Sequence, residues 1–185
     1  MINNPQIETN RLIFTPVTSK EIDLGWLNWI NNPNSFKYLE TKKATKDELI
    51  DYLKRSKPPK CYFFAARLKN NHEYIGNIRL SEINYKNKSC TYGRLLGATS
   101  QLNKGFGSEF LQAIQYFSFE ELNLKIIYTG VKNENLPSIK SNLKAGMSEM
   151  SISQTKKYMD PQKGCKYFCM TVESYYELKK LRDRF

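Results

Sequence analysis

The spacing of apolar residues changes along the chain, and each change marks the border of a predicted element. Residues 7–16 contain Arg11-Leu12-Ile13-Phe14 and predict a first strand, and residues 21–38 place Ile and Trp at the spacing of an amphipathic helix. A second helix is expected over residues 45–54, because Thr45 and Glu48 form the capping-box pattern that begins a helix. The chain therefore starts with one strand and two helices.

The middle of the chain predicts an antiparallel meander, and the rest alternates helices with strands. Three apolar runs, at residues 62–68, 74–83 and 90–96, are joined by short polar loops, which is typical of neighbouring antiparallel strands. The elements expected after them are a helix at 108–122, a strand at 125–131, a helix at 137–145 and a hairpin of 147–158 with 165–172. This order predicts a mixed α/β fold built on one sheet.

Length and composition fit a single domain over residues 1–185, with a core at about 7–172 and a helical tail at 173–185. Hydrophobic residues make up 40% of the chain. No stretch approaches the roughly 18 apolar residues that cross a bilayer, and the first residues lack the basic and apolar blocks of a signal peptide. We therefore expect a cytoplasmic protein without a membrane span.

Charge and cysteine content narrow the expected partners. The four cysteines are scattered and the chain has one histidine, so neither a disulfide framework nor a metal site is expected. The net charge of +11 favours anionic partners. Because the basic residues form no long run and no nucleic-acid signature accompanies them, a phosphate-rich small molecule is preferred to nucleic acid.

The segment Asn103-Lys104-Gly105-Phe106-Gly107-Ser108 lies between a predicted strand and a predicted helix. Its two glycines allow backbone conformations and close approaches that side chains prevent. The amides after them belong to a helix N-terminus, where unpaired N–H groups and the helix dipole favour an anion. The segment therefore predicts a cradle for a pyrophosphate. It is not a Walker A loop, because no Gly-Lys-Ser/Thr follows at the required spacing.

A second motif, Asn135-Leu136-Pro137-Ser138, opens the next predicted helix. Asn135 suits the N-cap, Pro137 the first turn, and Gly146 the C-terminal end of this helix. Asn135 and Ser138 are also expected to face the gap between two neighbouring strands.

These two motifs, in this order, resemble those of the Gcn5-related N-acetyltransferase superfamily. The first is similar to its Gln/Arg-x-x-Gly-x-Gly/Ala pyrophosphate loop, and the second to its Asn-x-x-Ser…Lys-x-Gly-Phe segment. The stretches IETNRLIFTPV, WLNWINNPN and YLETK are similar to the branch with ribosomal-protein N-terminal and amino-sugar or antibiotic acetyltransferases. The resemblance extends from Ile7 to about Val172. It implies a mostly antiparallel central sheet with helices on both faces and a C-terminal hairpin.

The resemblance also implies acetyl-CoA as the co-substrate and suggests which residues hold it. Leu95 and Leu96 would lie on the strand that binds the pantetheine arm through its backbone. Residues 103–108 would hold the pyrophosphate, and Asn135 would contact the pantetheine near the thiol.

This chain departs from the family pattern at three positions. Leu102 stands where the family has Gln or Arg, with Gln101 one place earlier, and Met147 stands where the family has an aromatic residue. Many members place a Tyr at the position of Asn142 to protonate the departing thiolate, which an amide cannot do. The branch with Ser at position 138 is thought to use that hydroxyl near the sulfur, so Ser138 is the candidate acid. The alternative is that Ser138 only satisfies a backbone group of the first helical turn.

The reaction needs a neutral acceptor amine, and therefore a carboxylate or a chain of waters as base. Glu82 is the best-placed carboxylate, because strand alternation puts it with Ile78 and Leu80 on a partly buried face. A solvated glutamate at the end of the strand is the alternative. Glu40 is a second candidate, which could instead grip a cationic acceptor.

Trp29, Tyr38 and Tyr92 are expected on the acceptor side, although aromatic residues at such positions can equally belong to the core. A basic chain favours a nucleotide-linked amino sugar, whose diphosphate Lys and Arg can bind. The N-terminal amine of a protein is the alternative acceptor. A module that binds acetyl-CoA or nucleic acid without catalysis is the alternative of another class. Both a monomer and a homodimer are compatible with the sequence.

Overall fold

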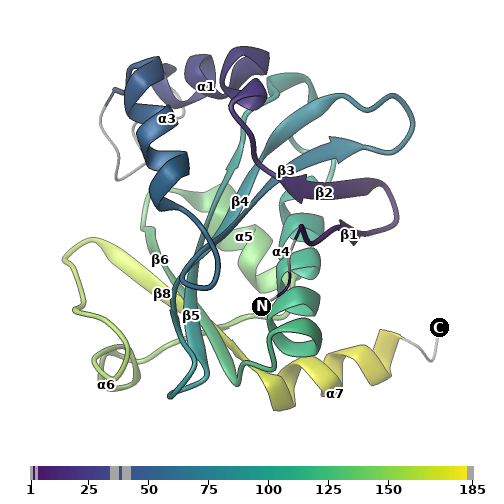
Figure 1. Ribbon diagram of the computed structural model, residues 1–185. Helices are drawn as coiled ribbons and strands as arrows, with labels where there is room; N and C mark the ends of the chain where they lie inside the picture. Colours follow the sequence, from purple (N-terminus) through teal and green to yellow (C-terminus); the bar gives the residue numbers. More distant parts are fainter. Residues whose placement is uncertain (1, 3, 34–37, 39–42, 183–185) are drawn as a thin grey trace.

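A single eight-stranded sheet runs through the molecule in the computed structural model, which describes residues 2, 4–33, 38 and 43–182 (Figure 1). The strand order across the sheet is β1-β2-β3-β4-β5-β6-β8-β7. All neighbours pair antiparallel except β5 and β6, which run parallel. The strands are β1 (Ile7–Glu8), β2 (Leu12–Pro16), β3 (Tyr62–Leu68), β4 (Tyr74–Asn84), β5 (Ser89–Leu96), β6 (Ile126–Lys132), β7 (Ser148–Glu149) and β8 (Cys165–Thr171).

Helices cover both faces of this sheet. One face carries η1 (Ile22–Trp26), α1 (Leu27–Asn31) and α3 (Lys46–Arg55), and the other carries α4 (Phe106–Tyr116), η3 (Phe117–Glu121) and α7 (Val172–Arg182). The remaining helices are η2 (Thr99–Gln101), α5 (Leu136–Lys144) and α6 (Ile152–Thr155). The predicted capping box of Thr45 and Glu48 is present at the start of α3.

Two hydrophobic clusters lie on the two faces of the sheet, because side chains alternate along each strand. On β3, Phe64 and Ala66 pack in the larger cluster with Phe110 and Phe117, while Ala65 joins the smaller cluster under α1 and α3. The aromatic rings of Phe64 and Phe117 meet edge to face, 5.1 Å apart. The middle strands are therefore buried on both faces.

The structure confirms the mixed α/β fold with its mostly antiparallel sheet, and two elements differ in detail from the prediction. Residues 7–16 form two strands instead of one, because the chain turns back where the Thr9 N–H donates to the Leu12 carbonyl (3.0 Å). In the C-terminal hairpin, β7 has only two residues and pairs with β8. A capping box of Ser151 and Gln154 begins α6 where the strand was expected to continue.

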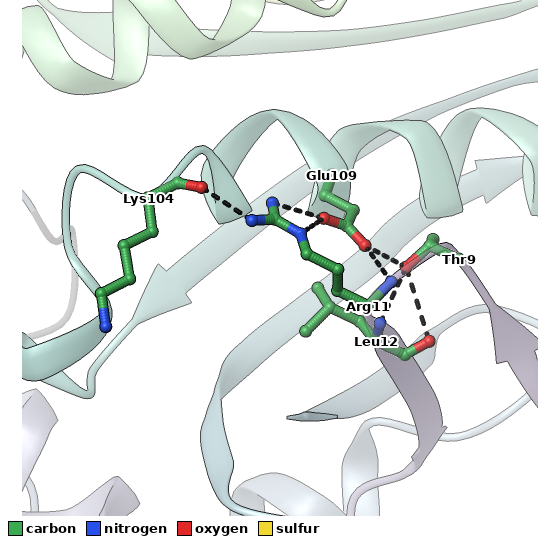
Figure 2. Close-up of polar contacts among 5 residues, drawn as sticks. All are labelled: Thr9, Arg11, Leu12, Lys104 and Glu109. Carbon is green, nitrogen blue, oxygen red and sulfur yellow. Dashed lines mark hydrogen bonds and ion pairs between the residues drawn. The ribbon is translucent and has the colours of Figure 1, made fainter. Parts of the chain in front are cut away.

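The turn between β1 and β2 is tied to the first turns of α4 through the Glu109 carboxylate (Figure 2). One oxygen accepts from the Thr9 hydroxyl (2.6 Å) and from the Arg11 backbone N–H (2.8 Å), and the other accepts from the Arg11 Nε (2.8 Å). The same guanidinium donates to the Lys104 carbonyl (3.0 Å) and lies 4.1 Å from the centre of the Phe106 ring. This contact, the Arg11–Glu109 tie, holds the loop before α4 against the edge of the sheet.

The Arg11–Glu109 tie makes stability depend on pH. Burial raises the pKa of the Glu109 carboxyl, but the hydrogen bonds from Thr9 and Arg11 outweigh burial and hold this pKa below its ordinary value of 4.5. The ionised carboxylate is therefore favoured in the folded state. Its contribution is fully present above the unfolded-state pKa and is lost as the pH falls through the lower folded-state pKa.

We expect Glu109→Gln to lower the free energy of unfolding at neutral pH by about 1–3 kcal/mol, because an amide loses the charge-assisted bonds to Arg11. The difference from wild type should shrink as the pH falls below about 4.5. Urea unfolding of both proteins from neutral to acidic pH measures this difference. Glu8→Gln is the control, because it removes the exposed ion pair with Lys69 and should cost less. A Glu109→Gln cost that does not vary with pH would contradict the assignment.

Candidate active site

The parallel strands β5 and β6 pair over three residues and then separate. The paired residues are Ser89 with Ile126, Cys90 with Ile127 and Thr91 with Tyr128. Beyond them β5 continues along β4 and β6 continues along β8, and within the described chain the two strands no longer pair with each other. We call this opening the β5–β6 split. The Thr129 hydroxyl on β6 donates to the Tyr92 carbonyl on β5 (3.0 Å), so the β5 edge that faces the split without a ladder partner on β6 begins after Tyr92.

The loop that follows β5 leads into the N-terminus of α4 and has the backbone of an anion cradle. Asn103 (φ +62°) and Gly105 (φ +85°) adopt left-handed conformations, and Gly105 is the N-cap residue of α4. The first amides of the helix, those of Phe106 and Gly107, are the ones that an α-helix leaves without an intrahelical partner. The Phe106 and Ser108 side chains are buried. Only the backbone of these two residues is therefore placed to meet a phosphate.

Gly107 lies where α4 packs closely against α5. A Cβ atom at this position would lie 2.8 Å from the Ser141 Oγ on α5. The glycine therefore lets α4 and α5 approach each other, so that the cradle and the second motif lie side by side.

The residues before the cradle brace it through side chains. Gln101 is buried, donates to a carboxylate oxygen of Glu73 (3.0 Å) and accepts from the Lys104 Nζ (3.1 Å). Leu102, which occupies the family's Gln/Arg position, is exposed. Gln101, one position before the family's Gln/Arg position, thus supports the loop through its side chain. Its contact with the Lys104 ammonium keeps that group beside η2.

The second motif forms the N-terminus of α5 beside the split. The Asn135 side chain caps the helix by accepting from the Ser138 N–H (3.2 Å). The Ser138 Oγ accepts from the Nη2 of Arg94 on β5 (3.1 Å), and the same nitrogen donates to the Ser138 carbonyl (3.2 Å). Arg94 therefore crosses from β5 to α5, next to the candidate acid.

Tyr92 and Asn142 form a buried polar pair one turn deeper. The Tyr92 hydroxyl donates to the Asn142 Oδ1 (3.0 Å), and burial raises the pKa of this phenol. Tyr92 was expected on the acceptor side, but its ring lies in the core between β5 and α5. Asn142 occupies the position of the family's tyrosine and has no exposed surface.

The other residues expected on the acceptor side lie in different places. The Trp29 ring packs on Tyr74 (centroids 4.7 Å apart) and against Gly97 at the end of β5, and it lines a hollow of about 610 Å³. The Tyr38 hydroxyl donates to the Glu134 carbonyl at the end of β6 (3.5 Å). Tyr38 therefore lies beside the split, whereas Trp29 lies near the cradle end of β5. Glu40 lies outside the described residues.

Glu82 is exposed, which corrects the expectation that it shares a partly buried face with Ile78 and Leu80. The register of β4 and β5 shifts between Ser81 and Asn84, and Glu82 has a positive φ of 52°. The shift breaks the alternation on which the expectation rested. The negative charge of Glu82 nevertheless affects Tyr128 on β6. Burial raises the pKa of Tyr128, and repulsion by the Glu82 carboxylate raises it further.

Sequence reasoning missed two arginines at this site. Arg94 follows Tyr92 by two positions on a strand, so alternation alone could have placed it on the face toward α5. Arg11 gave no local signal, because its partner Glu109 is distant in sequence. In the part of the chain that the structure describes, no group of three or more His, Cys, Asp or Glu residues gathers as a metal site would require. None of the described helices has the length and apolar character of a bilayer span.

Known proteins share both the sequence pattern and the fold. Residues 11–148 match the acetyltransferase (GNAT) domain family. The chain is 26% identical over 141 residues to an uncharacterized N-acetyltransferase, YnaD, of Bacillus subtilis (strain 168), which covers 76% of this chain and 81% of the relative.

Solved structures show the same fold. A spermidine N-acetyltransferase from Vibrio cholerae, in complex with CoA and spermine, superposes with a TM-score of 0.77 at 22% identity, covering 91% of this chain and 99% of that one. A GNAT-family acetyltransferase from Bacillus anthracis gives a TM-score of 0.74 at 20% identity, with coverage of 91% and 99%. With the family match over most of its length, this chain belongs to the acetyltransferase (GNAT) domain family and is an N-acetyltransferase that uses acetyl-CoA.

Proposed function

We propose that the enzyme acetylates the primary amine of a nucleotide-linked amino sugar. The observation that carries this proposal is positive charge at the open end of the β5–β6 split. Lys132 ends β6, and Lys163 precedes Gly164, whose carbonyl accepts from the Asn133 N–H (2.9 Å). Tyr38 is anchored to the neighbouring Glu134 carbonyl. Lys163 is exposed at this end and suits a diphosphate, whereas Lys132 already has another interaction.

Acetyl-CoA fits the residues that border the split. The pyrophosphate would meet the backbone of residues 103–108, whose conformation the Arg11–Glu109 tie supports from the opposite side. The pantetheine would follow the β5 edge at Leu95 and Leu96, and Asn135 would lie beside its thiol end. When bound, acetyl-CoA supplies the activated acetyl group.

Groups of this chain would orient the two reactants, accept the proton of the amine and donate a hydrogen bond to the sulfur. Backbone N–H groups of β5 that do not pair with β4 would polarise the thioester carbonyl. Glu82, exposed near Tyr128, could take the amine proton through water. Ser138 would donate to the sulfur, because its oxygen already accepts from Arg94 and its own hydrogen stays available.

Other acceptors fit the charge less well. The relative from Vibrio cholerae is a spermidine N-acetyltransferase, but a polyamine is cationic and this chain carries a net charge of +11. The N-terminal amine of a protein is the second candidate acceptor, because the sequence of this chain resembles the branch that contains ribosomal-protein N-terminal acetyltransferases. We place the reaction in the cytoplasm, where acetyl-CoA is available, and a monomer or homodimer remains the predicted assembly.

Acetyl-CoA should raise the thermal midpoint of the wild-type protein by about 5–10 °C at saturation, because a ligand that binds only the folded state stabilises it by mass action. Gly105→Glu should abolish this rise, because its Cβ would lie 3.6 Å from the Arg11 Nη2 and its carboxylate would add negative charge to the loop and compete with Glu109 for Arg11. Gly105→Ala is the matched control: it strains the left-handed backbone but adds no charge, so it should keep most of the rise. Equal shifts in wild type and Gly105→Glu would refute the cradle.

The acceptor is tested by measuring CoA release with uridine-diphosphate amino sugars, spermidine and short peptides. We expect turnover with the nucleotide sugars, and Lys163→Gln should raise the KM for them about 3–10-fold while leaving the affinity for acetyl-CoA unchanged. Lys69→Gln, at the ion pair with Glu8 beside β1, is the matched control and should leave KM unchanged. Turnover with peptides alone would favour the second candidate.

Ser138→Ala should lower kcat about 100-fold without weakening acetyl-CoA binding, because it removes the donor to the leaving sulfur. Ser141→Ala is the control on the same helix, since its hydroxyl donates to the Pro137 carbonyl (2.8 Å) within α5. Steady-state kinetics with the best acceptor and calorimetry with acetyl-CoA separate the two effects. An unchanged kcat would assign the proton to water.

A further inference from the structure

Arg94 leaves one of its donors without a partner inside the molecule. Its Nη2 is used twice, toward the Ser138 carbonyl and Oγ, but the buried Nη1 has no hydrogen-bond partner among the described residues. A guanidinium is a donor only, and leaving a buried donor unsatisfied costs about 1–3 kcal/mol. The free Nη1 therefore points to an acceptor that is not part of the described chain.

The position of Arg94 on β5 indicates which group of a bound ligand could accept a hydrogen bond from its Nη1. The cradle at residues 103–108 follows the end of β5, and Leu96 and Leu95 precede it on the strand. An arm that starts at the cradle and runs back along the open edge of β5 passes Leu96 and Leu95 before it reaches Arg94 and Ser138. The far end of the pantetheine arm, with its sulfur, is thereby brought to the guanidinium.

The charge of Arg94 is suited to an anion at this place. Burial lowers the pKa of the guanidinium, and Tyr92 opposes that effect. Arg94 is partly buried as a residue, but its Nη1 atom is fully buried, and an anion facing that atom would offset the cost of its burial. Asn142, whose Oδ1 accepts from the Tyr92 hydroxyl, is an amide, and its N–H groups are not acidic enough to protonate a thiolate.

We propose that Arg94 is a catalytic residue that stabilises the CoA sulfur as it leaves as a thiolate. The amine nitrogen forms the new C–N bond, the C–S bond breaks, and its electron pair stays on the sulfur. The proton lost by the amine passes through water to Glu82, as proposed above. The Arg94 cation faces the negative charge on the sulfur while the Ser138 hydroxyl donates a hydrogen bond to it. This inference rests on the proposed use of the split by acetyl-CoA and deepens it.

The test compares binding of CoA with binding of desulfo-CoA, which lacks the sulfur, and needs no acceptor. Calorimetry at a pH near the ordinary thiol pKa of about 8.5 should show wild type binding CoA about tenfold more tightly than desulfo-CoA. Arg94→Gln should lose this preference, and Arg94→Lys should keep part of it. Arg79→Gln is the matched control, because Arg79 lies on the neighbouring strand opposite Gly93 and contacts Tyr52 on the other face.

A second readout is the ultraviolet absorbance of the bound thiolate, followed against pH. Subtracting the desulfo-CoA complex removes the signal of the protein's own thiols. Burial raises the pKa of three of them: Cys61 to about 11, Cys90 to about 12, and Cys169. The pKa of the Tyr92 phenol is also raised by burial, so this group stays neutral during the titration. The bound CoA thiol should ionise about one pH unit lower in wild type than in Arg94→Gln.

Each outcome separates this inference from the proposed function. Equal affinities of CoA and desulfo-CoA in wild type, or an equal loss of both in Arg94→Gln, would overturn the thiolate role and leave Arg94 as a structural link between β5 and α5. Failure of both ligands to bind wild type would overturn the proposed use of the split, and the inference with it. Loss of the preference in Arg79→Gln as well would show that the effect is not specific to Arg94.

Discussion

The short parallel pairing of β5 with β6 is the constraint on which the site depends. Every other strand pair in the sheet is antiparallel, and the parallel pair is held by only three residue pairs, from Ser89–Ile126 to Thr91–Tyr128. Each strand is then held by its other neighbour, β4 or β8, so the two can diverge without losing the sheet. The divergence leaves a backbone edge inside the protein, which an extended ligand can use as a substitute strand.

The two ends of this split are built by different means. At the cradle end, backbone conformation dominates: Gly105 caps α4, while Arg11 and Gln101 hold the loop from opposite sides. At the α5 end, side chains dominate, because Arg94 and Tyr92 both reach across from β5 to α5. A family position often occupied by tyrosine is taken by Asn142, which serves as a buried partner of Tyr92. In the proposed mechanism, the neighbouring Arg94 guanidinium and Ser138 hydroxyl take over the role of that phenol.

Sequence reasoning succeeded where the signal is local and failed where partners are distant. The capping box at Thr45, the strand at residues 62–68 and the Asn135 N-cap each rest on residues a few positions apart, and all are present in the structure. Glu82 was misplaced because a bulge adds residues to one strand only, which alternation cannot reveal. The Arg11–Glu109 tie joins the turn between β1 and β2 to α4, and an arginine or a glutamate in the sequence does not indicate which distant residue it pairs with.

The close contact of Gly107 with Ser141 has a consequence for how the sequence can vary. The two helices that carry the cradle and the candidate acid are separated at this point by one hydroxyl group. The side chains at positions 107 and 141 occupy the same space between the helices, so the structure limits their combined volume. A larger residue at position 107 requires the Ser141 hydroxyl to rotate away or a smaller residue to replace it, so substitutions at the two positions should be coupled during divergence.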